Sequence, residues 1–516
     1  MKKEKAVSKD ESASFALEII AEIDKGKIKN SHALEKAKIA VSKKYKFDKI
    51  IKNADIALYA KDEKIRKFLK TKPIRTASGV ANIAVMWFSE NSCPGKCIYC
   101  PQGTKENRRV PKSYTGSEPA TRRALRYNYD PYKQIKNRLK QFSIIGHKTD
   151  KCELIIMGGT FSAAPKSYQD EFIRRCFDAF NPRPSKSLTE AQKRNEGAKN
   201  RVIGLTIETR PDYCSGKDIE QMLKLGCTRV ELGLQTTDPK ILKEIKRGYS
   251  IAEGKKAIKR LKDAGLKVCV HWMPGLTGLE KLDIKKEISL FEKLFSDSDY
   301  RPDELKIYPT LVIEGTELFE LWKNKKYSPL TVKQMENLLI ALKKEIPPYV
   351  RVKRVMRDIS EKEVAAGPKT TNLRQLAKEN KNFSCQCIRC REVGLKNKEL
   401  EKTELCRIEY KASKGKEIFL SYEDRKNKIL LGFLRLRLTK EKALIRELHV
   451  YGEMAELGKK GIIQHRGYGK MLLKEAEKIS RLEKKKIIQI TSGVGVRDYY
   501  RKLGYNKKGM YMARKI

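Results

Sequence analysis

The stretch that decides the fold is a strand, a helix and a strand at residues 228–275. TRVELGLQT (228–236) is an apolar run of strand length, SIAEGKKAIKRLKDAG (250–265) is helical in pattern, and LKVCVHWMPG (266–275) is a second apolar run of strand length. This order predicts a parallel β/α unit, because two parallel strands need a long crossover connection between them.

Further strands of this kind occur on both sides of the unit, between residues 73 and 360. They are GVANIAVMWF, CELIIMGG, RVIGLTIETR and ELKIYPT. Strand and helix alternate over a length that predicts an α/β fold, an open or partial barrel of the TIM type. Nearly every strand ends in Gly, Pro, Arg, Glu or Gln, which suits a ligand-binding mouth at the carboxyl edge of the strands. Residues 185–200 have no apolar pattern and indicate a surface insertion.

Three other regions flank this barrel. Residues 1–72 have helical periodicity and carry 20 basic against 11 acidic side chains, which indicates a small basic helical region. Residues 361–410 contain a cysteine cluster and look like a connector between domains. Residues 411–516 begin with strands of antiparallel type and continue with a glycine-led helix, so we predict a separate α+β domain there.

The composition favours a polyanionic partner. The 516 residues correspond to about three domains, and 113 Lys and Arg against 64 Asp and Glu give a net charge of +49. Nucleic acid is the expected partner; the alternative is a solvated Lys/Glu-rich surface, which would balance its charges better. No stretch approaches the ~18 apolar residues that span a bilayer, and the N-terminus has no secretory pattern. We expect a cytoplasmic protein without membrane contact.

The loop NSCPGKCIYCPQG (91–103) places three thiols, Cys93, Cys97 and Cys100, close together after a strand. Three thiolates on one tight loop can hold three irons of a 4Fe-4S cluster and leave the fourth iron open for a ligand. The alternative is a zinc site that takes a fourth ligand from elsewhere. The spacing, with an aromatic residue before the last cysteine, resembles the radical S-adenosylmethionine (SAM) enzymes.

Candidate SAM contacts follow the barrel strands. Gly158, Gly159 and Thr160 end one strand, where a backbone group could meet the amino acid part of SAM. Glu208, Gln235 and His271 end the following strands, and catalytic groups of such barrels collect at these ends. We assign the first two to SAM or substrate binding and His271 to catalysis. Each of them could equally be an ordinary loop residue.

The C-terminal region contains a second ligand-binding motif. Gln464, Gly467 and Gly469 form Q-x-x-G-x-G before an amphipathic helix and after the strand ELHVYG (447–452). Glycines let the backbone approach a diphosphate, and the helix N-terminus offers free N–H groups; the alternative is a plain tight turn. The motif resembles the acetyl-CoA loop of GNAT acetyltransferases. In that family a tyrosine near the thioester often follows, which indicates Tyr499 and Tyr500 as catalytic candidates.

A radical SAM barrel joined to a GNAT domain is rare, and the whole chain resembles the catalytic subunit of Elongator in its single-chain archaeal form. One departure is Gln102, where that family usually has glycine. The blocks that carry the resemblance include KPIRTASGVA (72–81), SYTGSEPATRRA (113–124), MGGTF (157–161), ETRPDYC (208–214), YPTLVIEGTEL (308–318), CQCIRCRE (385–392) and SGVGVRDYYRKLGY (492–505).

The resemblance implies carboxymethylation of the wobble uridine of tRNA at C5, with SAM and acetyl-CoA as co-substrates. A 5′-deoxyadenosyl radical would take hydrogen from the acetyl methyl group, the carbon would join C5, and the thioester would be hydrolysed. The family's acetyl-CoA contacts match Lys151, Glu447, Leu448, His449, Val450, Tyr468, Gly469, Lys470 and Tyr500. Without the family, Lys151 would be taken for a solvated lysine.

The second cysteine cluster, Cys385, Cys387 and Cys390, resembles a structural zinc knuckle. A fourth ligand is needed, and Cys406 or one of the five histidines could provide it. The alternative is three reduced cysteines without a metal.

The tRNA partner, through its anticodon stem-loop, also has local support. Residues 105–148 hold 12 Lys and Arg against three acidic residues, interleaved with tyrosines. This mixture suits phosphate neutralisation and base stacking, or else a charged helix face with core tyrosines. The competing hypotheses are a protein lysine acetyltransferase with a structural iron-sulfur cluster and a tRNA-binding scaffold without activity. Accessory subunits and a homo-oligomer stay open.

Overall fold

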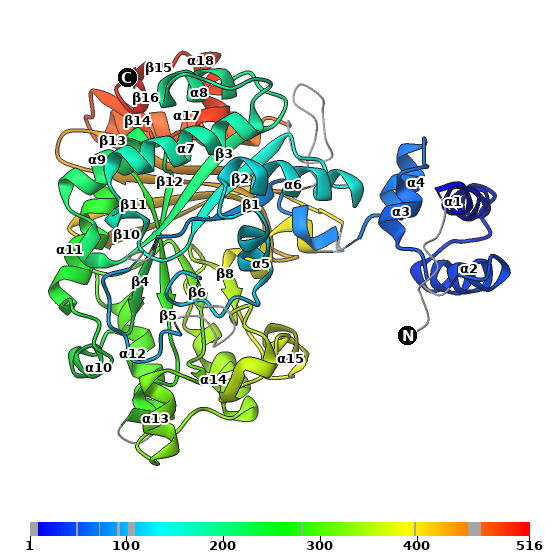
Figure 1. Cartoon of the computed structure of the whole chain (residues 1–516). Helices are drawn as coiled ribbons and strands as arrows, with labels where there is room; N and C mark the ends of the chain where they lie inside the picture. The colour runs from blue at the N-terminus through cyan, green and yellow to red at the C-terminus, as the bar shows by residue number, and fades with distance from the viewer. Residues whose placement is uncertain are drawn as a thin grey trace.

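The computed structural model describes residues 9–47, 50–71, 73–89, 93–101, 109–279, 282–396, 399–452 and 466–516. In these ranges the chain forms a body with two sheets, and a group of N-terminal helices stands to one side of it (Figure 1). None of the described helices combines the length and the apolar character that crossing a bilayer requires.

The first sheet is a parallel half-barrel of seven strands in the order β1-β2-β3-β4-β5-β6-β8. Neighbouring strands pair in parallel throughout, so the predicted partial barrel is confirmed. The strands are β1 (Ala81–Met86), β2 (Lys151–Met157), β3 (Arg201–Thr209), β4 (Arg229–Gln235), β5 (Lys267–Trp272), β6 (Glu304–Ile307) and β8 (Arg351–Val355).

Helices connect these strands and pack on the outside of the barrel, as the alternating pattern predicts (Figure 1). A short antiparallel pair, β7 (Val312–Ile313) and β9 (Val364–Ala366), lies beside the sheet. The helices are α5 (Pro119–Arg126), α6 (Pro131–Ile144), α7 (Lys166–Phe180), α8 (Leu188–Asn195), α9 (Gly216–Lys224), α10 (Pro239–Glu244), α11 (Ile251–Asp263), α12 (Ile284–Ser296), α13 (Glu317–Lys323), α14 (Val332–Lys344), α15 (Leu373–Glu379) and α16 (Ile388–Arg391).

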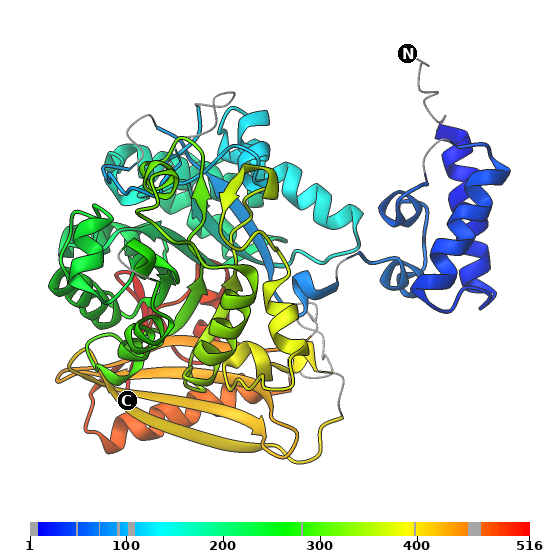
Figure 2. The ribbon, with the colours of Figure 1, turned by 90° about the horizontal axis from the view of Figure 1, so that it is seen from below.

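The second sheet has the order β10-β11-β12-β13-β14-β16-β15. Its first four strands are antiparallel, as expected, and the parallel pairing of β13 with β14 makes the sheet mixed. Helix α17 (Tyr468–Leu482) packs on it, and α18 (Arg497–Arg501) follows β14. Figure 2 shows this sheet at one end of the body, with the barrel above it. Its strands are β10 (Glu404–Ala412), β11 (Gly415–Asp424), β12 (Ile429–Leu438), β13 (Ala443–Val450), β14 (Ile487–Ile490), β15 (Asn506–Lys508) and β16 (Tyr511–Lys515).

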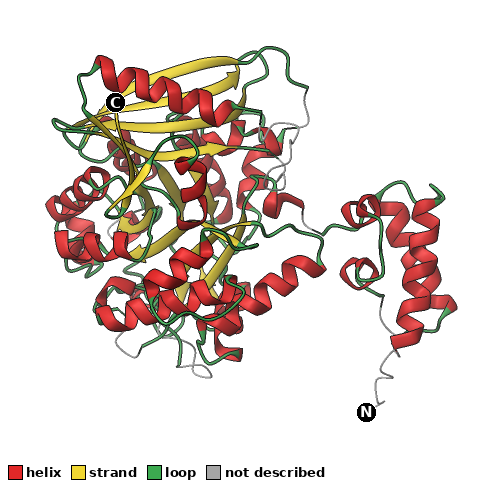
Figure 3. Cartoon of the chain, turned by 90° about the horizontal axis from the view of Figure 1, so that it is seen from above, coloured by secondary structure: helices red, strands yellow, loops and turns green. Residues whose placement is uncertain are grey.

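The N-terminal region is helical, as expected, and has an apolar core of its own. Its helices are α1 (Lys9–Asp24), α2 (Ser31–Lys44), α3 (Asn53–Ala57) and α4 (Glu63–Phe68). Phe15, Ile19, Leu34 and Leu69 are buried together in that core. Figure 3 shows the four helices connected to the body by a thin segment of chain.

Residues 185–200 are not the surface insertion that their polar pattern indicates. They contain α8, and Ala191 and Asn195 are fully buried. The Asn195 side chain donates to Asn181 Oδ1 at 3.0 Å and accepts from the Val202 N–H at 2.8 Å. Glu196 pairs with Arg501 of the second domain at 2.7 Å. The segment is buried through polar contacts, which hydrophobic periodicity does not reveal.

The two sheets meet through buried charges. Arg446 on β13 contacts both carboxylate oxygens of Asp303, just before β6, at 2.6 and 2.7 Å. A glycine at 493 is needed for the same interface, because a Cβ there would lie 2.0 Å from the Ile203 carbonyl oxygen. The second domain is therefore fixed against the amino-terminal ends of the barrel strands.

Candidate functional sites

The carboxyl-terminal ends of the barrel strands surround a first cavity, which we call the carboxyl-end cavity. It brings together residues that the sequence analysis assigned to the cluster, to SAM and to catalysis. These are Cys93, Cys100, Gly159, Thr160, Glu208, Gln235 and His271. Position 158 must be glycine, since it has a φ of +121° and a Cβ there would lie 2.4 Å from the Trp87 carbonyl oxygen.

Polar groups surround the three thiols of the 93–100 loop. Arg247 Nη1 donates to Cys97 Sγ at 3.2 Å, and Thr160 Oγ1 donates to Cys93 Sγ at 3.4 Å. The hydrogen bond with Cys100 lowers the pKa of Cys97 to about 5 in spite of its burial, and Arg247 adds to this effect. Thiolates in electropositive surroundings are the form that binds metal.

The spacing of the thiols separates the two alternatives for this loop. A single zinc ion with bonds of about 2.3 Å holds its thiolates about 3.8 Å apart. Among the described residues, Cys385, Cys387 and Cys390 have all ligand atoms within 4.8 Å of one another, and Cys93, Cys97 and Cys100 do not form such a trio. At least one pair of the latter three sulfur atoms is therefore more than 4.8 Å apart, which is farther than one zinc ion would hold two thiolates.

Several buried polar atoms around this cavity have no hydrogen-bond partner within the described ranges. They include Tyr99 Oη, Arg210 Nη1, Gln235 Oε1 and Arg247 Nε. Gln235 also has a φ of +70°, which a non-glycine residue rarely adopts. Since buried polar groups are normally paired, these atoms fit a polar ligand with several donors and acceptors, as SAM is.

Part of the wall of the carboxyl-end cavity is a cluster of titratable side chains. His271 Nε2 is 3.3 Å from Glu231 Oε2, and Lys306 Nζ contacts Glu231 and lies 3.6 Å from Glu208 Oε1. Burial raises the pKa of Glu208 to about 7, against the opposing charge of Lys306. Burial also lowers the pKa of His271. The cluster can take up and release protons near neutral pH.

Sequence analysis missed Glu231, Arg247 and Lys306 as members of this site. A signal existed for Glu231 and Lys306, because each is a charged residue next to apolar residues in a strand that is buried throughout its length. Buried charges are seldom found without a partner or a function. Arg247 lies beyond a helix and carries no such signal.

A second cavity of about 660 Å³ lies between the two domains, at the amino-terminal ends of the same strands, and we call it the amino-end cavity. Glu447, Leu448 and His449 of β13 line it together with barrel residues such as Arg229 and Lys267. Although burial raises its pKa, Lys267 and then Arg435 hold the pKa of Glu447 at about 2.

Lys151, a predicted acetyl-CoA contact, is the first residue of β2, two positions before Glu153 of the cavity wall. Burial lowers its pKa to about 8. Its place at the start of β2 puts Lys151 at the end of the barrel that faces the second domain. Its lowered pKa shows that it is not a fully solvated lysine.

The glycine motif lies at the N-terminus of α17, where Tyr468, Gly469 and Lys470 form the first turn. Gly467 is the N-cap with a φ of +92°, and a Cβ on Gly469 would lie 3.1 Å from Tyr499 Oη and 3.7 Å from Val450 Cγ2. Strand β13 pairs with β14 only from residue 443 to 445. The remainder of β13, which includes Val450, lies beside this turn. Gln464 lies outside the described residues.

The two tyrosine candidates take different positions. Tyr499 is partly exposed next to the α17 turn, whereas Tyr500 is buried in the apolar core of the second domain. Their rings are 5.2 Å apart. Tyr499 is thus the one whose hydroxyl reaches the glycine motif.

The cysteines at 385, 387 and 390 are held beside α14. Lys343 Nζ donates to Cys387 Sγ at 3.3 Å. Within the described chain neither Cys406 nor a histidine joins the trio within 4.8 Å.

Comparisons with known proteins agree with this arrangement. The profile of the ELP3 N-terminal domain matches residues 13–77, that of the Radical SAM superfamily matches residues 90–291, and that of the Radical_SAM C-terminal domain matches residues 302–382.

Relatives match over nearly the whole chain. A tRNA uridine(34) acetyltransferase of Methanocaldococcus infernus is 49% identical over 492 residues, which cover 90% of this chain and 91% of that protein. Elongator complex protein 3 of Schizosaccharomyces pombe is 39% identical, with 97% of each chain covered.

A solved structure agrees as well. The structure of Methanocaldococcus infernus Elp3 with an N-terminal deletion has a TM-score of 0.74 and 46% identity, and the match covers 85% of this chain and all of that one. The resemblance to the catalytic subunit of Elongator is thereby confirmed. The chain belongs to the Elp3 family of radical SAM proteins.

Proposed function

We propose that this protein modifies uridine 34 of tRNA, joining the methyl carbon of acetyl-CoA to C5 and leaving a carboxymethyl group. Its relatives are called tRNA uridine(34) acetyltransferases. The observation that carries the proposal is that one barrel has a three-thiol loop at the carboxyl ends of its strands and a glycine-led helix of an acetyltransferase-type domain near their amino ends.

Cys93, Cys97 and Cys100 would hold the 4Fe-4S cluster, and Gly158, Gly159, Thr160, Glu208 and Gln235 would surround SAM. When bound, the cluster and SAM together would supply a 5′-deoxyadenosyl radical. This radical can remove hydrogen from a methyl group that acid–base groups cannot deprotonate. Gln235 Oε1 and Arg210 Nη1, which have no hydrogen-bond partner among the described residues, are available to orient the ligand.

The diphosphate of acetyl-CoA would bind at Gly467, Tyr468, Gly469 and Lys470. Free N–H groups and the positive end of the α17 dipole favour an anion at this turn. The pantetheine arm would follow residues 447–450 into the amino-end cavity, and Tyr499 would contact it at the turn.

After the carbon radical has joined C5, substitution of uracil also requires that the adduct radical gives up one electron, which balances the electron consumed by SAM cleavage, and that the C5 proton leaves. Glu208 can accept a proton, since its carboxyl has a pKa of about 7 and receives a hydrogen bond from the Tyr114 hydroxyl at 3.3 Å. His271 lies in the same cluster and is available as a second proton carrier. Both residues line the carboxyl-end cavity, where they would act on a bound nucleotide.

The trio Cys385, Cys387 and Cys390 would hold a structural zinc ion. The distances among the three sulfur atoms fit one tetrahedral ion. The ion would fix the connector between the two domains.

Transfer of acetyl to lysines of other proteins is the less favoured function. The amino-end cavity is lined by the barrel strands on the side opposite β13, with Arg229, Lys267 and Lys353 in its wall. A basic protein tail would meet these positive charges, which stand beside Glu153 and Glu304 of the same wall, and it would have to reach an acetyl group that would lie against the barrel.

The test is nucleoside analysis after anaerobic incubation of the reconstituted protein with SAM, a reductant, acetyl-CoA and tRNA. We expect carboxymethyluridine from the parent protein. The Cys97→Ser variant should lose SAM cleavage and product while it keeps tRNA affinity, because the basic surface is unchanged. Undiminished 5′-deoxyadenosine formation by this variant would contradict the assignment of the loop.

A further inference from the structure

The two cavities lie at opposite ends of the same barrel bore. Arg229 lines the amino-end cavity and Glu231, two residues further along β4, lines the carboxyl-end cavity. Alternate residues of a strand face the same side and are separated by about 6.6 Å. Only one layer of side chains therefore separates the two cavities.

Strand β5 crosses this layer. Lys267 lines the amino-end cavity and His271 lines the carboxyl-end cavity. Cys269 is between them on the same face of the strand, in register with Glu231 of β4 and Glu304 of β6. It is fully buried, and its charged neighbours Glu231 and Glu304 raise the pKa of its thiol in addition to the effect of burial.

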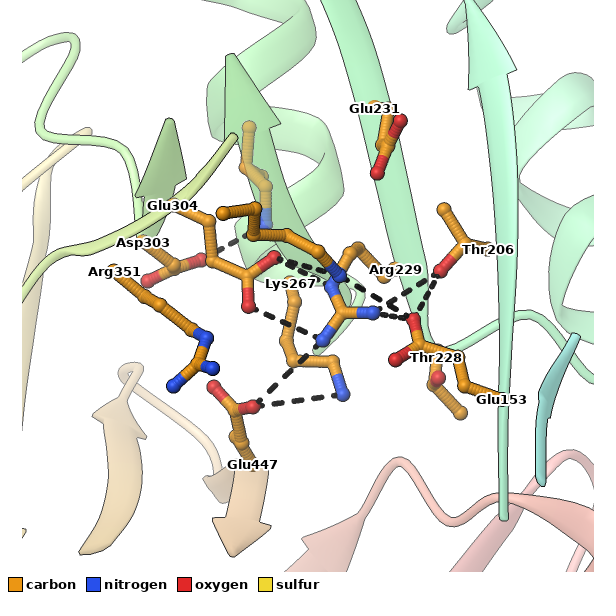
Figure 4. Close-up of polar contacts among 12 residues, drawn as sticks. Glu153, Thr206, Thr228, Arg229, Glu231, Lys267, Asp303, Glu304, Arg351 and Glu447 are labelled. Atoms are coloured by element: carbon orange, nitrogen blue, oxygen red, sulfur yellow. Dashed lines mark hydrogen bonds and ion pairs between the residues drawn. The ribbon is translucent and has the colours of Figure 1, made fainter. Parts of the chain in front are cut away.

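Ion pairs form the separating layer, as the close-up in Figure 4 shows. Arg229 contacts Glu153 and lies 2.5 Å from Glu304 Oε2, and Arg229 Nη1 donates to Thr206 Oγ1 at 3.1 Å. Lys353 Nζ lies 3.6 Å from Glu153 and 3.8 Å from Glu304. The layer thus consists of long side chains joined only by ionic contacts and hydrogen bonds.

This filling is unusual for a barrel whose function needs only stability. Layers of Val, Ile and Leu normally fill such a bore, and a buried ion-pair network is often no more stable than apolar packing of the same volume. Glu231 Oε1 even lacks a hydrogen-bond partner among the described residues. A polar bore is what a polar group passing through it would require.

We infer that the barrel bore is the path by which the acyl end of acetyl-CoA reaches the carboxyl-end cavity, and that the layer of Arg229, Glu153, Glu304 and Lys353 is the gate on this path. The inference rests on the proposed function. Along β5, Lys267 and His271 are about 13 Å apart. The acyl end has to move this distance to reach the carboxyl-end cavity. The ion pairs of the gate separate to let the thioester pass and re-form when it withdraws.

Cys269 provides a native reporter inside the bore. In bromoacetyl-CoA the methyl group of the acyl end carries bromine. The sulfur of Cys269 would displace bromide from that carbon, with loss of the thiol proton, and a thioether would form. The reaction needs neither the cluster nor SAM, and the site of alkylation is read by peptide mass spectrometry of the full-length protein.

We expect bromoacetyl-CoA to alkylate Cys269 at least tenfold faster than bromoacetamide at the same concentration and at pH 8.5. Excess acetyl-CoA should suppress the reaction, and Cys269→Ser should abolish it. Lys353→Met, which removes one member of the gate, should accelerate it several-fold.

Two results would overturn the inference, and they are distinguishable. Because the pKa of the Cys269 thiol is raised, its reaction with bromoacetamide is the reference for its intrinsic reactivity. Bromoacetyl-CoA that competes with acetyl-CoA for binding but alkylates Cys269 no faster than bromoacetamide does would refute the bore as the path. Failure to compete would refute the acetyl-CoA site of the proposed function, and the path would fall with it.

Discussion

Glu208 is the last residue but one of β3. Its carboxylate lies 3.6 Å from Lys306 Nζ and accepts a hydrogen bond from the Tyr114 hydroxyl. Burial raises its folded-state pKa from 4.5 to about 7. A carboxyl with a raised pKa stabilises the fold fully below its unfolded pKa, and this contribution is lost as the pH rises through the folded value. Between about pH 4.5 and 7, Glu208 therefore makes the protein less stable as the pH increases.

We predict that Glu208→Gln reduces this pH dependence. The fall in the free energy of unfolding between pH 5 and pH 8 should be smaller in the variant than in the parent, as measured by urea denaturation of the cluster-free protein. Product formation should also fall at least tenfold, because the amide cannot accept the proton. An identical pH dependence in both proteins would contradict the assigned ionisation.

Among the single functional residues, those in local sequence motifs could be predicted from the sequence. The cysteines of the 93–100 loop and the glycines of the α17 turn were predictable, since their chemistry depends on spacing along the chain. Arg247 was not, because a turn of the chain 150 residues from Cys97 brings its guanidinium to that sulfur at 3.2 Å. Tyr499, which sequence analysis set beside Tyr500, is distinguished only by the packing around each ring.

Helix α17 is the element on which acetyl-CoA binding depends in this account. Gly467 at its N-cap has a positive φ, and no atom of the described residues lies within 4 Å of where a Cβ would be. Gly509 in the turn before β16 has the same two properties. Gly509 has a φ of +58° where Gly467 has +92°, and it lies away from the α17 turn, so it serves as the control position.

We predict that Gly467→Val raises the Kd of acetyl-CoA at least tenfold, while Gly509→Val does not change it. Both should destabilise the domain by about 1–2 kcal/mol, since a side chain at positive φ is strained. Isothermal titration gives the affinities and thermal melting gives the shared destabilisation. Equal affinities of the two variants would show that the α17 turn does not hold the diphosphate.

The strands and most helices were predictable from apolar periodicity, and α8 was not. Its buried face includes Gln192 and Asn195, which a hydropathy pattern assigns to the surface. For the charged residues of the bore the reverse holds: the strand was predicted correctly, but the role of its charged side chains was not. Glu304 and Lys306 lie in a strand that is short and apolar at its other positions, so the strand was recognised and its charges were not interpreted.

The charge of the whole molecule is expected to serve tRNA binding. The net charge is +49, and the N-terminal helices have an apolar core separate from that of the body. Phosphate contacts release counterions, so the logarithm of the affinity falls with the logarithm of the salt concentration by about 0.7 to 0.9 per phosphate. The N-terminal helices should account for part of this slope.

We predict that deletion of residues 1–71 weakens tRNA binding at least tenfold at physiological salt and makes the salt dependence less steep. SAM cleavage by the reconstituted protein should persist, because the barrel core is intact. Filter binding over a range of salt concentrations measures the slope. A slope unchanged by the deletion would assign the phosphate contacts to the body alone.

For the whole molecule, the sequence predicted the kinds of fold that are present but not how the barrel and the second domain pack against each other. The contact depends on Arg446 with Asp303 and on the close approach of residue 493 to the start of β3. These residues lie far apart along the chain, and no local pattern links them. The position of the second domain at the amino ends of the barrel strands therefore became visible only in the structure.

The most direct test of the account follows deuterium from the methyl group of acetyl-CoA. The reconstituted protein is incubated with trideuterated acetyl-CoA, SAM, a reductant and tRNA, and both 5′-deoxyadenosine and the wobble nucleoside are analysed by mass spectrometry. If the 5′-deoxyadenosyl radical takes hydrogen from the acetyl methyl group, 5′-deoxyadenosine gains one deuterium and the carboxymethyl group of the nucleoside keeps two. A modified nucleoside formed without deuterium in 5′-deoxyadenosine would contradict the account.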